Sequence, residues 1–307
     1  MEKALHIEAP CKINLHLHVQ GRRFDGYHSL ESIFLALNFG DTLRFFPVSS
    51  AAGDVCIVRW DGPAGESPVS GDGFKPEENI VLKAAALFRA RTGFDQPVRV
   101  ELDKRIPLGG GLGGGSSDAA AVLRAFNTLA GTALAADAMV EMAEELGSDV
   151  PFFLDLNRGP AALVSGRGEY VLPLGEPPPL WVVLVNPGFS SGTAAAFRLL
   201  DEAGGPAFSG PSGEALAAVL REEPRKWSYS NDFLPVFLAA GAAKAREAYS
   251  GILRDLKVLG AEFIGLSGTG ATCFGIFTSR DQAIWAEIFL KKFWSFVQLT
   301  VPLRVQK

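Results

Sequence analysis

The chain has 307 residues, of which 48% are hydrophobic and 21% are charged, a composition typical of a globular protein with a substantial core. Its formal net charge of −5 argues against general nucleic-acid binding, and no apolar run is long enough to span a membrane. Charged residues and a proline interrupt the first dozen positions, so we expect no secretory signal sequence there. The three cysteines (Cys11, Cys56 and Cys273) have neither metal-binding nor disulfide spacing, so we expect reduced thiols in a cytoplasmic protein.

The first expected element is a strand over residues 5–20, because apolar and polar residues alternate there, most regularly from Leu15 to Val19. Lys12 and Asn14 lie two positions apart, so their side chains share one face of this strand. Taken alone, such a pair is as readily explained by a solvated strand face as by a functional site.

A short segment rich in recognition-type side chains follows, Gly21-Arg-Arg-Phe-Asp-Gly-Tyr-His28. Its centre, Asp25-Gly26, is a strong turn signal. Arginine forks suit phosphate oxygens and aromatic faces suit a flat base. We therefore favour a binding loop over a solvated turn.

The next hundred residues alternate between apolar and turn-rich segments. Residues 30–46 form an apolar stretch that fits either a helix or a strand. Residues 47–78 are rich in Pro, Gly, Ser and Asp, which indicates a surface excursion that contains a short strand from Val55 to Trp60. Asn79 then caps a helix whose apolar stripe is Val81, Ala84, Ala85 and Phe88.

A glycine-rich loop stands at the centre of the chain, Pro107-Leu-Gly-Gly-Gly-Leu-Gly-Gly-Gly-Ser-Ser-Asp118. A strand-like run (97–102) precedes the loop, and a helix follows it with Ala119, Val122, Leu123, Phe126 and Ala130 on one face. Consecutive glycines let the backbone wrap a small anion, and Ser116-Ser117-Asp118 suits a helix N-cap. Strand, glycine loop and helix N-terminus together predict a phosphate-binding site.

This loop matches neither of two known phosphate-binding motifs in an informative way. The P-loop pattern is not met, because no lysine lies between Pro107 and Asp118. The dinucleotide pattern G-x-G-x-x-G is met by Gly109, Gly111 and Gly114, but in so glycine-rich a run the match is nearly automatic. A flexible linker is the plain alternative, and it is disfavoured because linkers rarely join a strand to a strongly patterned helix.

Asp149 is the most interesting carboxylate of the following region. A second helix is expected over residues 136–146, ending at Gly147, and an apolar run follows Asp149. The carboxylate should be partly buried and therefore needs a cationic or hydrogen-bonding partner. From local sequence alone, a capping or turn aspartate is the better explanation. Residues 155–180 are rich in turns and contain the expected domain boundary.

The remainder of the chain mixes strands and helices, which predicts an α+β protein. The expected elements are a buried strand (181–185), a loop (186–193) with Thr193 as a possible N-cap, a helix beginning near 230–233, strands at 261–266 and 272–277, a helix over 281–293 and a strand over 297–305. The turn Ser267-Gly-Thr-Gly-Ala271 fits equally a tight hairpin and a place where backbone approaches a ligand closely.

Four segments, taken jointly and in order, resemble the 4-diphosphocytidyl-2-C-methyl-D-erythritol kinases, a family of the GHMP kinase superfamily. They are Pro10–Asn14, Gly21–His28, Pro107–Asp118 and Leu146–Pro151, and the turn 267–271 resembles the third glycine motif of the superfamily. The glycine loop alone indicates the superfamily, and the first two segments narrow it to this family. The resemblance spans nearly the whole chain, although Cys11 stands where the family usually has alanine.

This resemblance implies an α+β, two-domain GHMP kinase fold. A ribosomal-protein-S5-like, ATP-binding domain is expected over residues 1–163. A ferredoxin-like α/β sandwich with a four-stranded antiparallel sheet is expected over residues 164–307. The active site is expected in the cleft between these two domains. The implied reaction is ATP-dependent phosphorylation of the 2-hydroxyl of the diphosphocytidyl-methylerythritol substrate, in the non-mevalonate route to isopentenyl diphosphate.

The resemblance also implies roles for individual residues. Lys12 and Asp149 match the catalytic pair, with Asp149 accepting or orienting the hydroxyl proton and Lys12 stabilising charge at the attacking oxygen. The residues implied to bind ATP are Asn79, Lys104, Pro107, Leu108, Gly109, Gly110, Gly111, Leu112, Gly113, Gly114, Gly115, Ser116 and Ser117. Those implied to bind the substrate are Asn14, Tyr27, His28, Phe189 and Thr193. Mg²⁺ is implied by ATP chemistry, but no carboxylate pair matches a ligand set, which leaves Ser116 as the candidate protein contact.

Two alternatives remain at this stage. Another GHMP kinase, acting on homoserine or mevalonate, is disfavoured by the segment Gly21–His28. A catalytically silent nucleotide-binding regulator is disfavoured because Lys12 and Asp149 are both present. The expected partner is a small molecule rather than a nucleic acid or a membrane, and the sequence indicates no oligomeric state.

Overall fold

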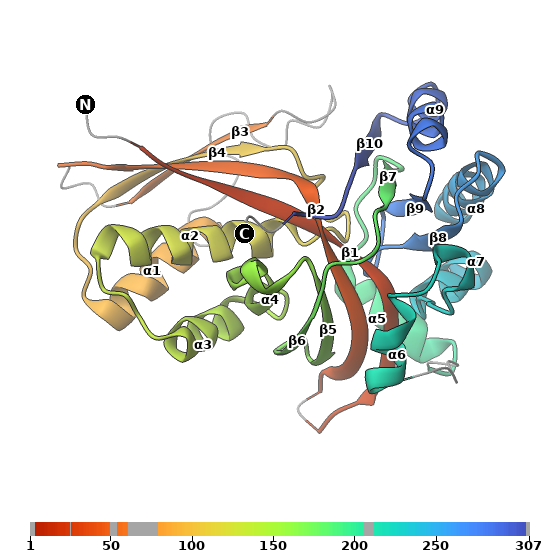
Figure 1. The fold of residues 1–307 in the computed structure, drawn as a ribbon. Helices are drawn as coiled ribbons and strands as arrows, with labels where there is room; N and C mark the ends of the chain where they lie inside the picture. The colour runs from red at the N-terminus through yellow and green to blue at the C-terminus, as the bar shows by residue number, and fades with distance from the viewer. Residues whose placement is uncertain (1–3, 25, 50–53, 61–78, 206–211, 305–307) are drawn as a thin grey trace. The chain divides into compact units, whose positions relative to one another are not determined.

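The computed structural model describes residues 4–24, 26–49, 54–60, 79–205 and 212–304, and it has the expected α+β content (Figure 1). Its contacts divide the chain into two compact units. The first comprises Met1–Cys11, Phe39–Ile106 and Gly113–Leu156, and the second comprises Lys12–Asn38, Pro107–Leu112 and Asn157–Lys307. The units are discontinuous because two long strands, β1 (Leu5–Arg22) and β2 (His28–Pro47), each run through both. A family domain boundary near residue 163 stays a prediction.

The first unit contains three strands of a six-stranded sheet, in which β1 also pairs with β2. β3 (Val55–Trp60) pairs in parallel with β4 (Val98–Lys104), and β4 pairs antiparallel with the C-terminal half of β2. The short strand expected at 55–60 is therefore confirmed. The rest of the excursion at 47–78 lies largely outside the described residues.

Four helices accompany this sheet: α1 (Ile80–Thr92), α2 (Gly114–Ala130), α3 (Ala136–Leu146) and α4 (Val150–Leu154). Helix α2 packs against the other three. The apolar stripe expected on α1 is buried, and so is that on α2 except for the half-buried Ala130. The rings of Phe88 and Phe126 meet edge to face with centroids 5.8 Å apart. Asn79 is the N-cap of α1, as predicted, and its Oδ1 accepts a hydrogen bond from the Val81 N–H at 2.9 Å.

The start of α2 differs from the expectation. Its N-cap is Gly113, which has a left-handed φ of +71°, so the helix begins before Ser116-Ser117-Asp118. The prediction that this triplet caps the helix is therefore wrong. The glycine turns the chain early, and the Asp118 carboxylate bonds to Lys104 instead of to its own helix.

In the second unit, the N-terminal half of β2 pairs antiparallel with β5 (Ala161–Gly166), which pairs antiparallel with β6 (Tyr170–Gly175). Residues 30–46, which fitted a helix or a strand, thus belong to a strand. A second sheet has the order β10-β7-β9-β8 and is antiparallel throughout, as predicted. Its strands are β7 (Trp181–Asn186), β8 (Phe263–Leu266), β9 (Cys273–Phe277) and β10 (Phe296–Thr300).

The helices of the second unit are α5 (Thr193–Glu202), α6 (Gly213–Val219), α7 (Phe233–Ala240), α8 (Ala243–Val258) and α9 (Arg280–Leu290), with single 3-10 turns at Leu156–Arg158 and Pro224–Lys226. Helices α8 and α9 pack on the four-stranded sheet (Figure 1). Gly192, not Thr193, is the N-cap of α5, so that prediction is wrong: Thr193 is the first helical residue and its exposed side chain makes no capping bond.

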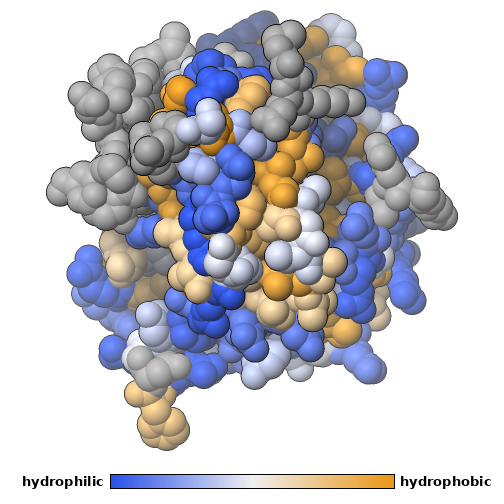
Figure 2. Space-filling model, turned by 90° about the vertical axis from the view of Figure 1, so that its left-hand side faces the viewer, coloured by the Kyte–Doolittle hydropathy of each residue, from blue (hydrophilic) through white to orange (hydrophobic). Residues whose placement is uncertain are grey.

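Among the described residues, no helix combines the length and the apolar composition needed to cross a bilayer. Figure 2 shows one face of the molecule, on which hydrophobic residues lie between hydrophilic ones. The three cysteines are free thiols, and Cys11 and Cys273 are buried.

Candidate active site

Lys12 and Asn14 do not form a solvated strand face. Both residues are only 3% exposed, and the Lys12 ammonium donates a hydrogen bond to Asn14 Oδ1 at 2.6 Å. The ammonium also lies 4.4 Å from the centre of the Phe34 ring, and the Asn14 amide donates to Ser32 Oγ at 2.9 Å. The alternation of the strand thus fixes a buried cation next to a polar cluster.

The first half of the glycine loop, Pro107–Leu112, belongs to the same unit and is anchored beside this cluster. The Lys12 N–H donates to the Leu112 carbonyl at 2.9 Å. The Ser267 hydroxyl donates to the Gly111 carbonyl at 2.8 Å and accepts from the Asn14 N–H at 3.3 Å. The loop is therefore held between β1 and the turn that joins β8 to β9.

Gly111 makes the closest approach in this loop. Its φ is +75°, and a Cβ placed on it would lie 2.1 Å from the Ser267 carbonyl oxygen. No side chain fits at that distance from a backbone atom. The turn 267–271 joins the antiparallel strands β8 and β9, so the interpretation as a hairpin turn is confirmed, whereas a close approach of its glycines to a ligand stays a prediction.

The second half of the loop leads into α2 in the first unit. No side chain caps the helix at Gly113, so the amide groups of the first turn are available to an anion. Ser117 is 1% exposed, and its hydroxyl is among the buried polar atoms of the described residues that have no hydrogen-bond partner. This start of a helix fits a phosphate group.

The Lys104 side chain lies next to the first turn of α2, in a buried cluster of charges. Its ammonium donates to Asp41 Oδ2 at 2.5 Å and to Asp118 Oδ2 at 2.8 Å. Asp41 Oδ1 also accepts from the backbone N–H groups of Arg105 and Ile106. A Cβ on Gly114 would lie 3.2 Å from the ammonium, which places this cation directly beneath the loop.

Two carboxylates share one ammonium here, and the pKa of Asp118 reflects it. The pKa of Asp118 is raised from 3.8 to about 7 because burial, the largest cause, and the Asp41 charge both raise it and together outweigh the opposing Lys104 charge. For Lys104, burial alone would lower the pKa, but the charges of Asp118 and Asp41 outweigh it and raise the pKa. The cluster is closest to neutral when Asp118 is protonated.

A pH dependence of stability follows from this shift. Because the pKa of Asp118 is higher in the folded chain, its contribution to the free energy of unfolding is full below about pH 4 and is lost as the pH rises through about 7. Asp118→Asn should remove this loss. Between about pH 5 and about pH 8, wild type should lose on the order of 1–3 kcal/mol relative to the variant in urea unfolding. The exposed Asp137→Asn on α3 is the control, and parallel pH profiles for wild type and Asp118→Asn would contradict the expectation.

Tyr27 and His28 lie at the start of β2. The Tyr27 side chain is 55% exposed, and the Arg167 guanidinium lies 3.9 Å from the centre of its ring. His28 Nε2 lies 3.0 Å from Asp201 Oδ1 on α5, and its ring stacks on Phe197 with centroids 4.8 Å apart. The Tyr27 ring is thus exposed and in contact with Arg167, whereas the His28 ring is held in place by two residues of α5. Asp25 of the same segment lies outside the described residues.

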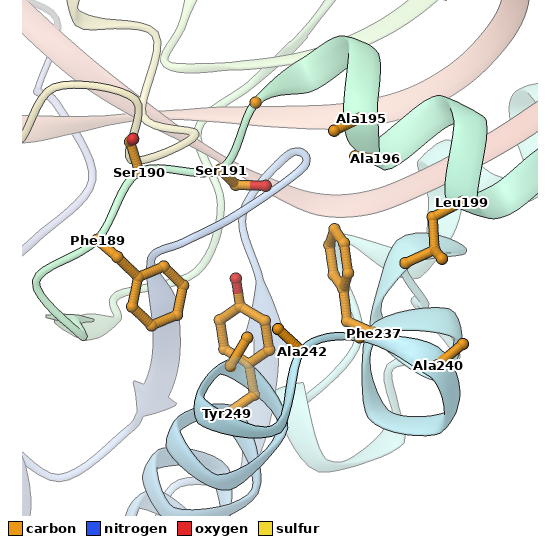
Figure 3. A pocket seen from close by; sticks show the side chains of 13 residues that line it. Phe189, Ser190, Ser191, Ala195, Ala196, Leu199, Phe237, Ala240, Ala242 and Tyr249 are labelled. Carbon is orange, nitrogen blue, oxygen red and sulfur yellow. The ribbon is translucent and has the colours of Figure 1, made fainter.

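Phe189 and Thr193 belong to the loop between β7 and α5. Phe189 lines a cavity of about 420 Å³, and its ring centroid lies 5.8 Å from that of Tyr249 (Figure 3). The Tyr249 hydroxyl points toward the loop at Ser190 and Ser191 (Figure 3). Thr193 Oγ1 lies 3.5 Å from Thr269 Oγ1, which joins this loop to the β8–β9 turn.

Asp149 is half-buried, as the sequence predicts, at the N-terminus of α4. Its side chain makes no capping hydrogen bond to that helix, but the residue lies in the turn between α3 and α4, so the interpretation as a turn aspartate agrees with the structure. The four residues after it (Val150, Pro151, Phe152 and Phe153) are buried and fix its position. A catalytic role for this carboxylate stays a prediction.

For a metal, the described part of the chain offers no group of three or more His, Cys, Asp or Glu side chains suited to bind one. Ser116, the candidate contact for Mg²⁺, is half-buried in the first turn of α2. Phosphate oxygens of a bound nucleotide would have to supply most ligands of a magnesium ion here.

Each unit brings together part of the predicted site. In the second unit these are Lys12, Asn14 and Pro107–Leu112, and in the first unit Lys104 and Gly113–Ser117 surround the start of α2. Sequence reasoning named no role for Ser32, Asp41, Asp201 and Thr272, and it assigned Asp118 to a helix cap instead of to the charge cluster around Lys104. The Thr272 N–H donates to the Gly110 carbonyl at 3.1 Å, and Thr272 directly follows the glycine turn 267–271, which could have drawn attention to it. No local sequence pattern distinguishes Asp201 from other surface carboxylates.

Comparison with known proteins places these residues in context. The model of the GHMP kinases N terminal domain matches residues 79–155. A curated protein of Treponema pallidum (strain Nichols), named 4-diphosphocytidyl-2-C-methyl-D-erythritol kinase, is 35% identical over 300 residues, covering 95% of this chain and 96% of the relative. A protein of the same name from Rhizobium johnstonii is 37% identical, with coverages of 90% and 85%. A crystal structure of 4-(cytidine 5'-diphospho)-2C-methyl-D-erythritol kinase has a TM-score of 0.75 at 32% identity and covers 98% of this chain and 100% of that chain.

Proposed function

Because this chain belongs to the 4-diphosphocytidyl-2-C-methyl-D-erythritol kinase family, we propose that Lys12 and Asp149 are the catalytic residues of its phosphoryl transfer. The protein is an ATP-dependent small-molecule kinase with the GHMP kinase fold. It phosphorylates the 2-hydroxyl of 4-diphosphocytidyl-2-C-methyl-D-erythritol, giving the 2-phosphate and ADP, in the non-mevalonate route to isopentenyl diphosphate. Its free cysteines support a cytoplasmic location.

The backbone from Pro107 to Ser117 holds the phosphates of ATP in this proposal. The start of α2 supports this role because no side chain caps its first N–H groups, and the close backbone packing at Gly111 holds the preceding loop in place. Asn79 and Lys104 lie near the nucleotide. Mg²⁺, when bound, neutralises phosphate charge, and Ser116 is its protein contact.

The observation that carries the catalytic proposal is the buried ammonium of Lys12, which is fixed by Asn14 Oδ1 at 2.6 Å. A positioned cation in a dry site stabilises charge that develops on the attacking oxygen. Asp149 orients the 2-hydroxyl and accepts its proton as the oxygen attacks. Positioning and charge stabilisation contribute most to the rate in phosphoryl transfer.

The substrate is recognised by both of its ends. Tyr27 stacks on the cytosine, His28 hydrogen bonds to it, and Phe189 covers its other face. Asn14 and Thr193 line the pocket for the methylerythritol. The exposed ring of Tyr27 and the place of Phe189 beside an open cavity support these assignments.

The test of the function is coupled ADP release with ATP, Mg²⁺ and a panel of diphosphocytidyl-methylerythritol, homoserine, mevalonate and galactose. Turnover with the cytidine compound alone is expected. Turnover with another alcohol would overturn the cytosine assignments of Tyr27 and His28. ATP binding without turnover on any member would favour the silent regulator.

Tyr27→Ala should raise KM for the cytidine substrate about 10- to 100-fold with little change in kcat, because stacking of a base on an aromatic ring is lost. Steady-state kinetics with saturating ATP measures this. Tyr170→Ala on β6 removes an equally accessible tyrosine, 65% exposed, and should leave KM unchanged. A rise in the KM for ATP of the same size would show that Tyr27 is structural.

A further inference from the structure

The imidazole of His28 is fixed by two residues of one helix. Asp201 Oδ1 lies 3.0 Å from its Nε2, and the Phe197 ring stacks on its face with an interplanar angle of 20°. Asp201 follows Phe197 by four positions on α5, so both side chains lie on the same face of the helix. The His28 side chain is only 10% exposed, whereas Asp201 is 46% exposed. Stacking on Phe197 therefore fixes the plane of the His28 ring, and the contact with Asp201 fixes its rotation within that plane.

This contact decides which nitrogen of the ring carries the proton. An ionised carboxylate only accepts hydrogen bonds, so Nε2 must be the donor. In a neutral imidazole the other nitrogen, Nδ1, then has a lone pair and only accepts. Asp201 thus makes the remaining nitrogen of His28 a hydrogen-bond acceptor.

We propose that Asp201 is a specificity-determining positioning residue, which selects cytosine over uracil through the tautomer of His28. The 4-amino group of cytosine donates a hydrogen bond, and Nδ1 can accept it. Uracil has a carbonyl oxygen at that position. This oxygen and His28 Nδ1 both accept hydrogen bonds, so no hydrogen bond can form between them. The inference rests on the proposed function, in which His28 hydrogen bonds to the base.

The tautomer can be measured directly by nitrogen-15 NMR of the histidine side chains, with the imidazoles neutral. The chain has four histidines, so His28→Gln identifies the signals of His28. Wild type should show a protonated Nε2 and an unprotonated Nδ1. Asp201→Ala should give a mixture of tautomers, whereas Asp201→Asn, whose carbonyl still accepts, should retain the wild-type form. A protonated Nδ1 in the wild type would overturn the proposal.

Selectivity is measured as the ratio of kcat/KM for the diphosphocytidyl and diphosphouridyl forms of the methylerythritol substrate. Asp201→Ala should lower this ratio about 10- to 100-fold, with kcat for the cytidine form changed less than about threefold. Asp201→Asn should restore most of the ratio. Glu202→Ala, which removes the neighbouring carboxylate of α5, is the matched control and should not change it. An unchanged ratio in Asp201→Ala would overturn the proposal.

His28→Ala separates this inference from the function on which it rests. If KM for the cytidine substrate does not change in His28→Ala, the assignment of His28 to the base is wrong. If KM rises in His28→Ala but selectivity is unaffected by Asp201→Ala, the base assignment stands and the tautomer proposal fails. Thermal unfolding of each variant verifies that it is folded.

Discussion

Replacing Asp149 with asparagine should lower kcat about 10²- to 10⁴-fold and change the affinity for ATP less than about threefold. The variant keeps the shape of the side chain but cannot accept the proton of the 2-hydroxyl. The effect should be local, because the Asp149 side chain makes no capping hydrogen bond to α4 and the residues that follow it are buried. Coupled ADP release gives kcat, and an ATP titration gives the affinity.

A matched control lies at the other end of the same short helix. Asp155 is exposed and follows the last residue of α4, so Asp155→Asn makes the same chemical change without reaching the reaction. Unchanged turnover in Asp149→Asn would remove this carboxylate from the mechanism. Equal losses in both variants would instead point to the packing of α4.

Gly111→Ala should weaken ATP binding roughly 100-fold or more and lower the free energy of unfolding by about 1–3 kcal/mol. The added Cβ would lie 2.1 Å from the Ser267 carbonyl oxygen and 2.8 Å from that of Gly270. Both atoms belong to backbone, so the loop itself must move, and its hydrogen bond from Ser267 is lost. An ATP titration and urea unfolding measure the two effects.

Gly251→Ala tests whether the loss is specific to position 111. Its Cβ would meet nothing within 4 Å, within the regular helix α8. This variant should be folded and should bind ATP as wild type does. Full ATP affinity in Gly111→Ala would refute the role of this backbone in phosphate binding.

The regular elements could be predicted because their periodicity is local. The stripe Val81, Ala84, Ala85 and Phe88 and the cap at Asn79 lie on one helix, where sequence spacing alone decides which side chains share a face. The antiparallel sheet of the second unit came from the family resemblance. The excess of turn residues around Val55–Trp60 did not hide that strand, because four consecutive apolar residues, Val55–Val58, begin it.

Helix starts were less predictable, because glycine geometry competes with side-chain capping. Gly113 and Gly192 take the N-cap positions that Ser116-Ser117-Asp118 and Thr193 were expected to occupy. A glycine with free backbone dihedrals can begin a helix before a capping side chain is reached. The sequence does not show which of the two wins.

The candidate site likewise contains contacts that local sequence spacing predicts and contacts that it does not. Lys12 and Asn14 were predicted to share a face from their spacing, and they are hydrogen bonded. The charged partners of Lys104, and the pairing of His28 with a residue 173 positions away, come from tertiary packing. No local pattern encodes such contacts, since they depend on how distant elements meet.

The interleaving of the two units has a consequence for synthesis on the ribosome. Every segment of the first unit precedes residue 157, so that unit can be complete while about half of the chain is still to be translated. The second unit begins with Lys12 but includes strands as late as β10. The backbone N–H of Asn14 must therefore wait for Ser267 to emerge, some 253 residues later in sequence. A nascent chain arrested between these points would present the start of α2 long before the strand that bears Lys12 acquires its final contacts.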